Sequence, residues 1–257
     1  MSILALDDVT FRYRGARQPA LDGVSMTVQP GRSLGIVGES GSGKSTALSL
    51  LLALREPSAG QVLFEGEPLR ARDTAQVRRL RRGVQPVFQD PYASLDPRMR
   101  IDRIVGEPLF SLGIERNAGA RRRRVAEALA EVGLGDDTLS RYPHEFSGGQ
   151  RQRIAIARAL ATEPSVLVAD EPVSALDVTT RIDVIALLDR LRRERGLGIV
   201  MVSHDISVVA ALCDDVAVLK DGRLVEAGET LPLLTSPREA YTRQLISAIP
   251  RLTPPVA

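Results

Sequence analysis

The sequence predicts an α/β fold with a mostly parallel sheet, an N-terminal antiparallel β subdomain and an inserted α-helical subdomain. After residue 165, short apolar runs alternate with helical stretches, as in parallel sheets that are buried on both faces. A glycine-rich loop joins a strand to a helix within residues 34–54. Between residues 101 and 160, apolar residues recur at helical spacing. These three patterns define the predicted fold class.

The individual elements follow in chain order from the same patterns and from turn signals at glycine and proline. In the first part of the chain we expect strands at 3–9, 24–28, 34–37, 61–64 and 85–88, and a helix at 44–54. Beyond the helical block we expect strands at 166–169, 199–202 and 216–219, with helices at 151–160, 179–195 and 206–212. We interpret residues 1–257 as one domain, with a catalytic core (about 1–88 and 165–235), a helical subdomain (about 89–164) and a short C-terminal tail (about 236–257).

Composition excludes several classes of protein. With 257 residues, 44% hydrophobic and 26% charged, the chain is long enough for a sizeable core. Its apolar runs are far shorter than the roughly 18 residues that span a bilayer, and its N-terminus does not resemble a signal peptide. The only cysteine, Cys213, excludes an internal disulfide and a Cys-built zinc site. We interpret it as a packing residue in an apolar helix.

The charge pattern argues against a nucleic-acid partner. Net charge is only +2, there is no tryptophan, and aromatic residues make up 4% of the chain. Lys44 and Lys220 are the only lysines among 34 basic residues. We interpret the arginine clusters at 78–82 and 121–124 as solvated helix faces, or as contacts to an acidic partner or a membrane surface.

Residues 38–45 read GESGSGKS and match the phosphate-binding P-loop pattern G-x-x-x-x-G-K-[ST]. Glycines let the backbone N–H groups surround a phosphate, and the helix that follows adds its own unpaired N–H groups. Lys44 supplies a compact positive charge, and Ser45 a hydroxyl that can bind Mg²⁺. A chance glycine turn would not need the strand and helix that flank this motif. The sequence therefore predicts a P-loop NTPase core, with the phosphate-binding residues Gly38, Glu39, Ser40, Gly41, Ser42, Gly43, Lys44, Ser45 and Thr46.

Two further motifs carry chemistry. Asp170 and Glu171 follow the apolar strand at 166–169, so both acids lie at the carboxyl end of the sheet, where ligands bind in such folds. We expect Asp170 to hold Mg²⁺ through its water shell and Glu171 to act as the general base on the attacking water. Residues Ser147, Gly148, Gly149 and Gln150 open the helix before this strand and form a second candidate anion site.

In this order the motifs resemble those of the ATP-binding-cassette (ABC) ATPases, over nearly the whole chain. Phe146–Gln150 is similar to the family signature, with Phe where Leu is commoner. Gln89 resembles the Q-loop glutamine, Ser174–Asp177 the D-loop and His204 the switch histidine, while Tyr13 matches the aromatic residue that stacks on adenine.

The resemblance implies ATP and Mg²⁺ as cofactors and a head-to-tail dimer, in which the signature of one subunit closes over ATP in the other. It assigns catalytic roles to Glu171, His204, Lys44 and Gln89. Metal ligands would be Ser45, Gln89 and Asp170, and nucleotide contacts beyond the P-loop would come from Tyr13, Ser147, Gly148, Gly149, Gln150 and Asp177.

A finer resemblance is to the second ATPase subunit of peptide and nickel importers, carried by residues 88–99, 241–245 and 248–250. It implies a paralogous ATPase partner (or a homodimer in isolation), two permease subunits with a substrate-binding protein, and a peripheral place on the cytoplasmic face of the membrane. By this resemblance, residues 90–97 receive a short permease helix, and changes at Tyr92 or Leu95 should lower transport while sparing basal ATPase activity. No cysteine follows Cys213, so we expect no iron–sulfur cluster.

The resemblance leaves the cargo open, as well as import against export. The alternatives are an exporter ATPase, or a cassette ATPase that acts on nucleic acid or ribosomes. One P-loop, and no coiled-coil or zinc insertion, disfavour the second alternative.

Overall fold

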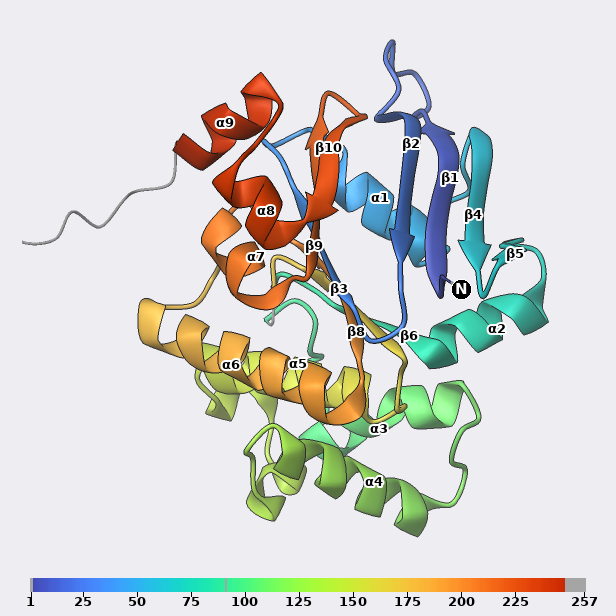
Figure 1. Cartoon of the computed structure of the whole chain (residues 1–257). Helices are drawn as coiled ribbons and strands as arrows, with labels where there is room; N and C mark the ends of the chain where they lie inside the picture. The colour runs from blue at the N-terminus through green and yellow to red at the C-terminus, as the bar shows by residue number, and fades with distance from the viewer. Residues whose placement is uncertain (1, 91, 248–257) are drawn as a thin grey trace, which may run out of the picture.

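The computed structural model describes residues 2–90 and 92–247, which form two sheets surrounded by helices (Figure 1). The smaller sheet is antiparallel and has the strand order β2-β1-β4-β5. Its strands are β1 (Leu4–Phe11), β2 (Leu21–Val28), β4 (Ala59–Phe64) and β5 (Glu67–Pro68). This sheet is the antiparallel subdomain that the turn-rich N-terminus predicts.

The larger sheet has the order β10-β9-β3-β8-β7-β6 and is parallel except at β10, which pairs antiparallel with β9. Its strands are β3 (Ser33–Val37), β6 (Val84–Val87), β7 (Val166–Asp170), β8 (Gly198–Val202), β9 (Asp215–Lys220) and β10 (Arg223–Glu229). The neighbouring strands β3, β8, β7 and β6 therefore end at one edge, where the loops after them meet. The predicted parallel sheet is confirmed.

Some helices gather at one end of the molecule, and the others lie against the sheets (Figure 1). Helices α3 (Ile101–Ser111), α4 (Ala118–Glu131) and α5 (Gly148–Leu160) pack on one another at one end, together with the 3₁₀ turns η1 (Asp136–Ser140) and η2 (Pro143–Glu145). The others are α1 (Lys44–Leu51), α2 (Thr74–Gly83), α6 (Val178–Arg195), α7 (Ile206–Leu212), α8 (Thr230–Thr235) and α9 (Ala240–Ser247). Within the described residues, no helix has the length and apolar character needed to cross a membrane.

Strand β7 shows how the large sheet separates two apolar cores. Val166 and Val168 belong to the core shared with α1 and the antiparallel sheet, whereas Leu167 and Ala169 belong to the core of the helical end. Successive side chains of a strand point to opposite faces, so a continuous apolar run serves both cores. The end of this strand is thereby held rigidly from both sides.

Several predicted boundaries were wrong. The first helix ends at Leu51 rather than at residue 54, because Ala53 takes a left-handed conformation with φ 53°. The helix expected from 151 begins at Gly148, since Ser147 caps it. Cys213 lies just after α7 rather than inside a helix; it is buried, and burial raises the pKa of its thiol to about 12, so it is an inert packing group.

Leu95 does not lie on a surface, as the predicted permease contact required. Its side chain is 1% exposed and belongs to the core of the helical end. Tyr92, in contrast, is 62% exposed. A change at Leu95 would therefore act through stability, and only Tyr92 of this pair is available to a partner.

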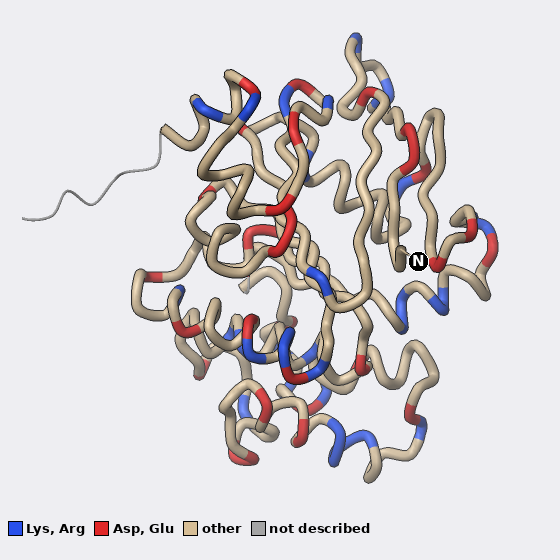
Figure 2. The backbone as a smooth tube through the Cα atoms, in the orientation of Figure 1, with Lys and Arg blue, Asp and Glu red and all other residues tan. Residues whose placement is uncertain are grey.

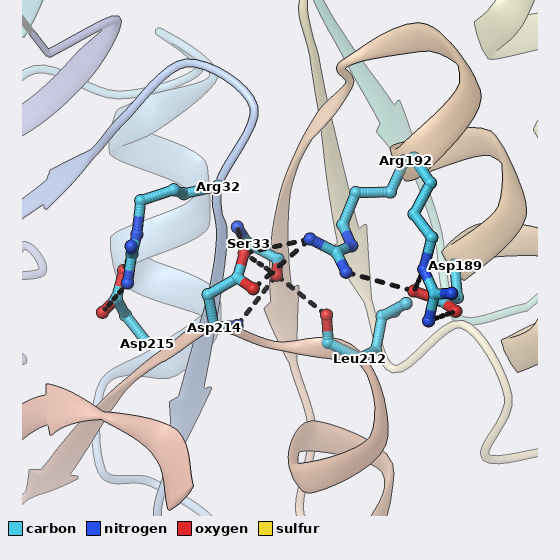
Figure 3. Close-up of polar contacts among 8 residues, drawn as sticks. Arg32, Ser33, Asp189, Arg192, Leu212, Asp214 and Asp215 are labelled. Carbon is cyan, nitrogen blue, oxygen red and sulfur yellow. Dashed lines mark hydrogen bonds and ion pairs between the residues drawn. The ribbon is translucent and has the colours of Figure 1, made fainter.

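Polar groups connect the beginning of the large sheet to the helices beside it (Figure 3). The Asp214 carboxylate accepts hydrogen bonds from the backbone N–H and the hydroxyl of Ser33, both at 2.8 Å, and pairs with Arg192 of α6. Arg32 forms a bidentate pair with Asp215 at 2.8 Å for both bonds. These contacts fix β3 relative to β9 and α6, and so fix the strand from which the P-loop emerges.

Candidate nucleotide-binding site

The P-loop runs from the end of β3 to the first residue of α1 and is built on glycine conformations. Gly41 and Gly43 have φ of 82° and 105°, in the region that L-residues rarely adopt. Gly43 caps α1 without any side-chain hydrogen bond, so the first N–H groups of this helix have no side-chain acceptor. A Cβ on Gly41 would meet nothing within 4 Å. The loop therefore presents open space beside unpaired N–H groups and the positive end of a helix, which suits a phosphate.

Lys44 lies inside this loop. Its Nζ donates to the carbonyls of Gly38 and Glu39, both at 2.8 Å. Burial lowers the pKa of Lys44, and the charges of Glu171 and Asp170 oppose that effect. The Ser42 hydroxyl is buried without a hydrogen-bond partner among the described residues. The Lys44 ammonium and the Ser42 hydroxyl can therefore each form a further hydrogen bond, at the place where the motif predicts phosphate oxygens.

The two acids at the end of β7 lie in different environments. Burial and the neighbouring charge of Glu171 raise the pKa of Asp170, while Lys44 opposes the rise. Glu171 has a left-handed backbone with φ 45°, and its N–H donates to Val202 of β8 at 2.9 Å. The backbone conformation therefore changes between Asp170, the last residue of β7, and Glu171.

Glu171 is held by two residues that come from other loops of the same sheet edge. Its Oε1 lies 3.1 Å from Nδ1 of His204, after β8, and its Oε2 accepts a hydrogen bond of 3.1 Å from Gln89, after β6. Gln89 also donates to the Ser174 hydroxyl at 3.3 Å. Because β6, β7 and β8 are adjacent, Gln89 and His204, which are 115 positions apart in the sequence, converge on the carboxylate of Glu171.

A groove of about 420 Å³ joins the P-loop to this carboxylate. It is lined by Tyr13, Ala20, Ser40, Gly41, Gly43, Lys44, Ser45, Thr46, Glu171 and His204. Tyr13 is 40% exposed, with its hydroxyl 3.1 Å from that of Thr46 and its ring 4.8 Å from the Arg55 guanidinium. An exposed ring beside the P-loop helix can stack on a base.

The signature residues gather in a different place. Ser147 caps α5 and forms a capping box with Gln150, each accepting from the other's backbone N–H. Asp177 caps α6 and accepts from the Thr180 N–H and hydroxyl, and these bonds lower the pKa of Asp177. Thr180 in turn packs against Gly149. Among the described residues that line the groove, none belongs to 147–150 or is Asp177.

The sequence did not predict three contacts of the site: Ala20 in the groove wall, the hydrogen bond from Gln89 to Ser174 of the D-loop segment, and the contact of Tyr241 with the P-loop. Tyr241 accepts a hydrogen bond from the backbone N–H of Glu39 in the P-loop. Its segment, residues 241–245, carries part of the importer resemblance, but nothing in its spacing indicates contact with a loop 202 positions earlier. Residues 248–250 of that resemblance lie outside the described residues.

Comparison with known proteins decides the family. The model of the ABC transporter family matches residues 21–174. The chain belongs to this family. It is 48% identical to a putative peptide import ATP-binding protein of Brucella ovis, over 95% of this chain and 77% of that protein. It is 47% identical to the dipeptide transport ATP-binding protein DppF of Haemophilus influenzae, over 91% of this chain and 72% of that protein.

Solved cassettes have the same fold. The chain is 30% identical to cbiO1 of Clostridium perfringens, part of the ABC transporter complex cbiONQ, with a TM-score of 0.82 and 91% of each chain covered. It is 33% identical to the cassette MJ0796, whose dimer was solved in a post-hydrolysis state with ADP and Pi, with a TM-score of 0.78 over 88% of this chain and 98% of that one. The predicted ABC ATPase fold is confirmed.

Proposed function

We propose that this chain is the ATP-hydrolysing subunit of a membrane importer for peptides, in which ATP binding closes a head-to-tail dimer and hydrolysis resets it. The observation that carries the proposal is the Glu171 carboxylate, held by Gln89 and His204 at one end of a groove that has the P-loop along its wall. Relatives named as peptide and dipeptide import ATP-binding proteins support the cargo class. The names of these relatives do not mention nickel, the other cargo expected from the resemblance.

The residues present fit ATP with Mg²⁺. Three groups would hold the phosphates: the Lys44 ammonium, the Ser42 hydroxyl, which has no partner among the described residues, and the first N–H groups of α1, which no side chain caps. Ser45 and Asp170 supply the oxygen ligands that Mg²⁺ prefers, and a cation there would favour the ionised form of Asp170, whose pKa burial raises. When bound, Mg²⁺ would neutralise phosphate charge. Gln89 is the third proposed ligand, although its amide donates to Glu171 in this structure.

The protein's own chemistry is proton transfer at Glu171. One carboxylate oxygen lies beside His204 Nδ1 and the other receives the Gln89 amide, so the group is fixed in orientation. We propose that Glu171 takes a proton from the attacking water and that His204 and Gln89 position the reacting groups. Tyr13 would stack on the adenine ring.

The separation of Ser147–Gln150 and Asp177 from the groove supports the dimer. In a head-to-tail pair, the signature of each cassette would complete the site of the other; the cassette MJ0796 was likewise solved as a dimer. The second cassette would be a paralogous ATPase or another copy of this chain. Two permease subunits, fed by a substrate-binding protein, would hold the pair at the cytoplasmic face of the membrane.

The test compares wild-type protein with Lys44→Ala. Lys44→Ala should weaken ATP binding by roughly tenfold or more, because a hydrogen bond to a charged group contributes about 1.5–3 kcal/mol and about 1.4 kcal/mol is tenfold. Equilibrium titration with magnesium ATP measures this. Unchanged affinity would remove the P-loop assignment. Peptide uptake into vesicles that hold the permeases, with the binding protein supplied, tests the importer, and uptake that does not depend on ATP would contradict it.

A further inference from the structure

Tyr241 connects the C-terminal helix α9 to the P-loop. Its side chain is 7% exposed and belongs to an apolar cluster that also includes Val209 of α7 and Leu233 of α8. The hydroxyl oxygen accepts a hydrogen bond of 3.2 Å from the backbone N–H of Glu39. A residue near the end of the described chain thus supplies an acceptor to the second residue of the phosphate loop.

The bond acts on a peptide group that also binds the phosphate-loop lysine. The N–H of Glu39 and the carbonyl of Gly38 belong to one planar peptide unit. Tyr241 binds this unit at its N–H, and Lys44 Nζ binds it at the Gly38 oxygen, 2.8 Å away. The orientation of the Gly38–Glu39 peptide therefore decides where one of the two carbonyl acceptors of Lys44 lies.

The surroundings leave this peptide little freedom on its other sides. A Cβ on Gly38 would lie 2.2 Å from the Leu219 carbonyl and 2.6 Å from the Ser42 hydroxyl. The N–H of Gly222 donates to the Ser42 carbonyl at 3.1 Å. The turn after β9 thus packs against the outer side of the loop, and Tyr241 completes this support.

Tyr241 is itself fixed in place. The Glu226 carboxylate of β10 accepts from the backbone N–H groups of Arg238 and Glu239, at 2.9 and 3.2 Å, just before α9 begins. The Lys220 ammonium lies 4.6 Å from the centre of the Tyr241 ring, within the range of a cation–π contact. Both lysines of the chain therefore adjoin the same tyrosine–peptide unit, Lys220 at the ring and Lys44 at the carbonyl.

We propose that Tyr241 is a positioning residue, which fixes the Gly38–Glu39 peptide so that Lys44 is held ready for the phosphates of the nucleotide. The inference rests on the proposed function, because it concerns ATP at the same loop. Without the hydroxyl, the peptide loses one of its two holding bonds and Lys44 starts from a less ordered position. ATP binding must then include the free-energy cost of ordering Lys44, and this cost lowers the affinity for ATP.

The experiment is a double-mutant cycle on the full-length chain, titrated with magnesium ATP. Tyr241→Phe keeps the ring and its packing and removes only the acceptor. It should raise the dissociation constant of ATP about twofold to tenfold, the range expected for one neutral hydrogen bond. The same change should have no effect in the Lys44→Ala background, since the two residues act through one peptide.

Two further variants separate positioning from folding. Lys220→Ala removes the cation next to the Tyr241 ring, and the change is made at an exposed residue. It should weaken ATP binding less than Tyr241→Phe does, and only when Lys44 is present. Tyr142→Phe removes a phenol hydroxyl far from the P-loop in sequence and should leave affinity unchanged. Thermal melts of every variant identify any that lose structure.

Each outcome decides between the two proposals. If Lys44→Ala leaves affinity intact, the proposed nucleotide site fails. If Lys44→Ala weakens binding but Tyr241→Phe does not, the site stands and the positioning role is wrong. An undiminished effect of Tyr241→Phe in the Lys44→Ala background would show that α9 acts through general stability, and would also overturn the role.

Discussion

Glu171 adopts a left-handed backbone conformation, with φ 45°, where β7 ends. A non-glycine residue there is strained and persists only when its surroundings hold it. Here the holding contacts are its N–H bond to Val202 and the side-chain contacts to His204 and Gln89. The same contacts that maintain this backbone conformation therefore also fix the orientation of the Glu171 carboxylate at the groove.

Replacing Glu171 by Gln should separate chemistry from binding. The amide keeps the size and the contact with Gln89 but lacks a basic oxygen, so turnover should fall roughly 10²–10⁴-fold. ATP affinity should stay near that of the wild type, because Lys44 and Ser45 are untouched. Turnover and affinity are measured with the partner ATPase present. Hydrolysis within about threefold of wild type would place water activation elsewhere, and His204→Ala would then be the next variant.

At this scale the sequence predicts residue identity better than residue environment. Lys44, Asp170 and Glu171 follow from local spacing, because a P-loop and a strand end are local features. The burial of Leu95 and the Tyr241 contact could not be predicted, since both depend on segments brought together by the sheet. The resemblance implied the same permease contact for Tyr92 and Leu95, but only Tyr92 is exposed in the structure.

Among the elements, the junction of α5 and α6 distinguishes the two signature glycines. A Cβ on Gly148 would make ordinary contacts, 3.8 Å from Leu176 and 4.0 Å from the Tyr92 hydroxyl. A Cβ on Gly149 would lie 2.2 Å from the Thr180 methyl. Thr180 also donates to the Asp177 cap, so it has little room to move. The first glycine has space within its own chain, and the second does not.

Gly148→Ala and Gly149→Ala should therefore fail in different ways. Gly149→Ala overpacks the junction and should lower the free energy of unfolding by about 1–3 kcal/mol. Gly148→Ala should leave unfolding unchanged and ATP binding intact but reduce hydrolysis, because its methyl would face the partner's nucleotide. Denaturant unfolding and turnover are measured for both. Full activity of a stable Gly148→Ala protein would contradict the placement of the signature at a dimer interface.

The Asp214 contacts that fix β3 make stability depend on pH (Figure 3). Burial alone would raise the pKa of Asp214, but hydrogen bonds from Ser33 and the charge of Arg192 hold it below its ordinary value. A carboxyl whose pKa is depressed by folding stabilises the native state above its unfolded pKa of about 3.9. This contribution is lost as the pH falls through the folded pKa.

Asp214→Asn should cost about 1–2 kcal/mol of unfolding free energy at pH 7, through weaker bonds to Ser33 and Arg192. The difference from wild type should shrink as the pH falls below about 3.9, where the unfolded carboxyl takes up a proton first, and should vanish only below the lower pKa of the folded carboxyl. Asp136→Asn, at an exposed position of η1, is the control and should hardly change the free energy of unfolding at either pH. A difference between wild type and Asp214→Asn that is as large at pH 3 as at pH 7 would exclude the charge as its cause.

Elements could be predicted where apolar periodicity is strong and not where it is weak. The core strands and α6 follow from their buried residues. Helix α2 buries only Gln76 and Leu80, and β10 buries none of its residues fully, so neither leaves a clear pattern. Charges of both signs are interspersed along the whole chain, including the arginines of α2 and α4 (Figure 2). The positions of α2 and β10 depend on their contacts with neighbouring strands, which an apolar pattern in their own residues does not reveal.

At the scale of the whole molecule, the groove and the signature residues lie apart within one chain. The groove lies at the edge where the strands of the large sheet end, whereas the signature begins α5 and packs on α6. We propose that closure of two cassettes brings these parts together, and that α5 transmits the closure. A signal from the membrane must then reach α5 to affect hydrolysis.

Tyr92 is placed to carry that signal. It is 62% exposed and follows the Q-loop, and its ring lies 4.0 Å from the guanidinium of Arg151 in α5. Tyr92→Ala should therefore lower peptide uptake by the reconstituted importer while basal ATP hydrolysis of the isolated subunit stays nearly unchanged. Phe110 is the matched control, because it is equally exposed and lies beside Arg121 of α4 rather than α5.

Phe110→Ala should leave both uptake and hydrolysis close to wild type, since it loses a similar aromatic–arginine contact without touching the signature helix. The measured quantity is the ratio of peptide uptake to ATP hydrolysed, in vesicles with identical permease content. This ratio should fall for Tyr92→Ala alone. Equal loss of uptake and hydrolysis in Tyr92→Ala would show a structural role at α5. An equal fall of the ratio in both variants would mean that the exposed aromatic residues, and not the link to Arg151, determine coupling.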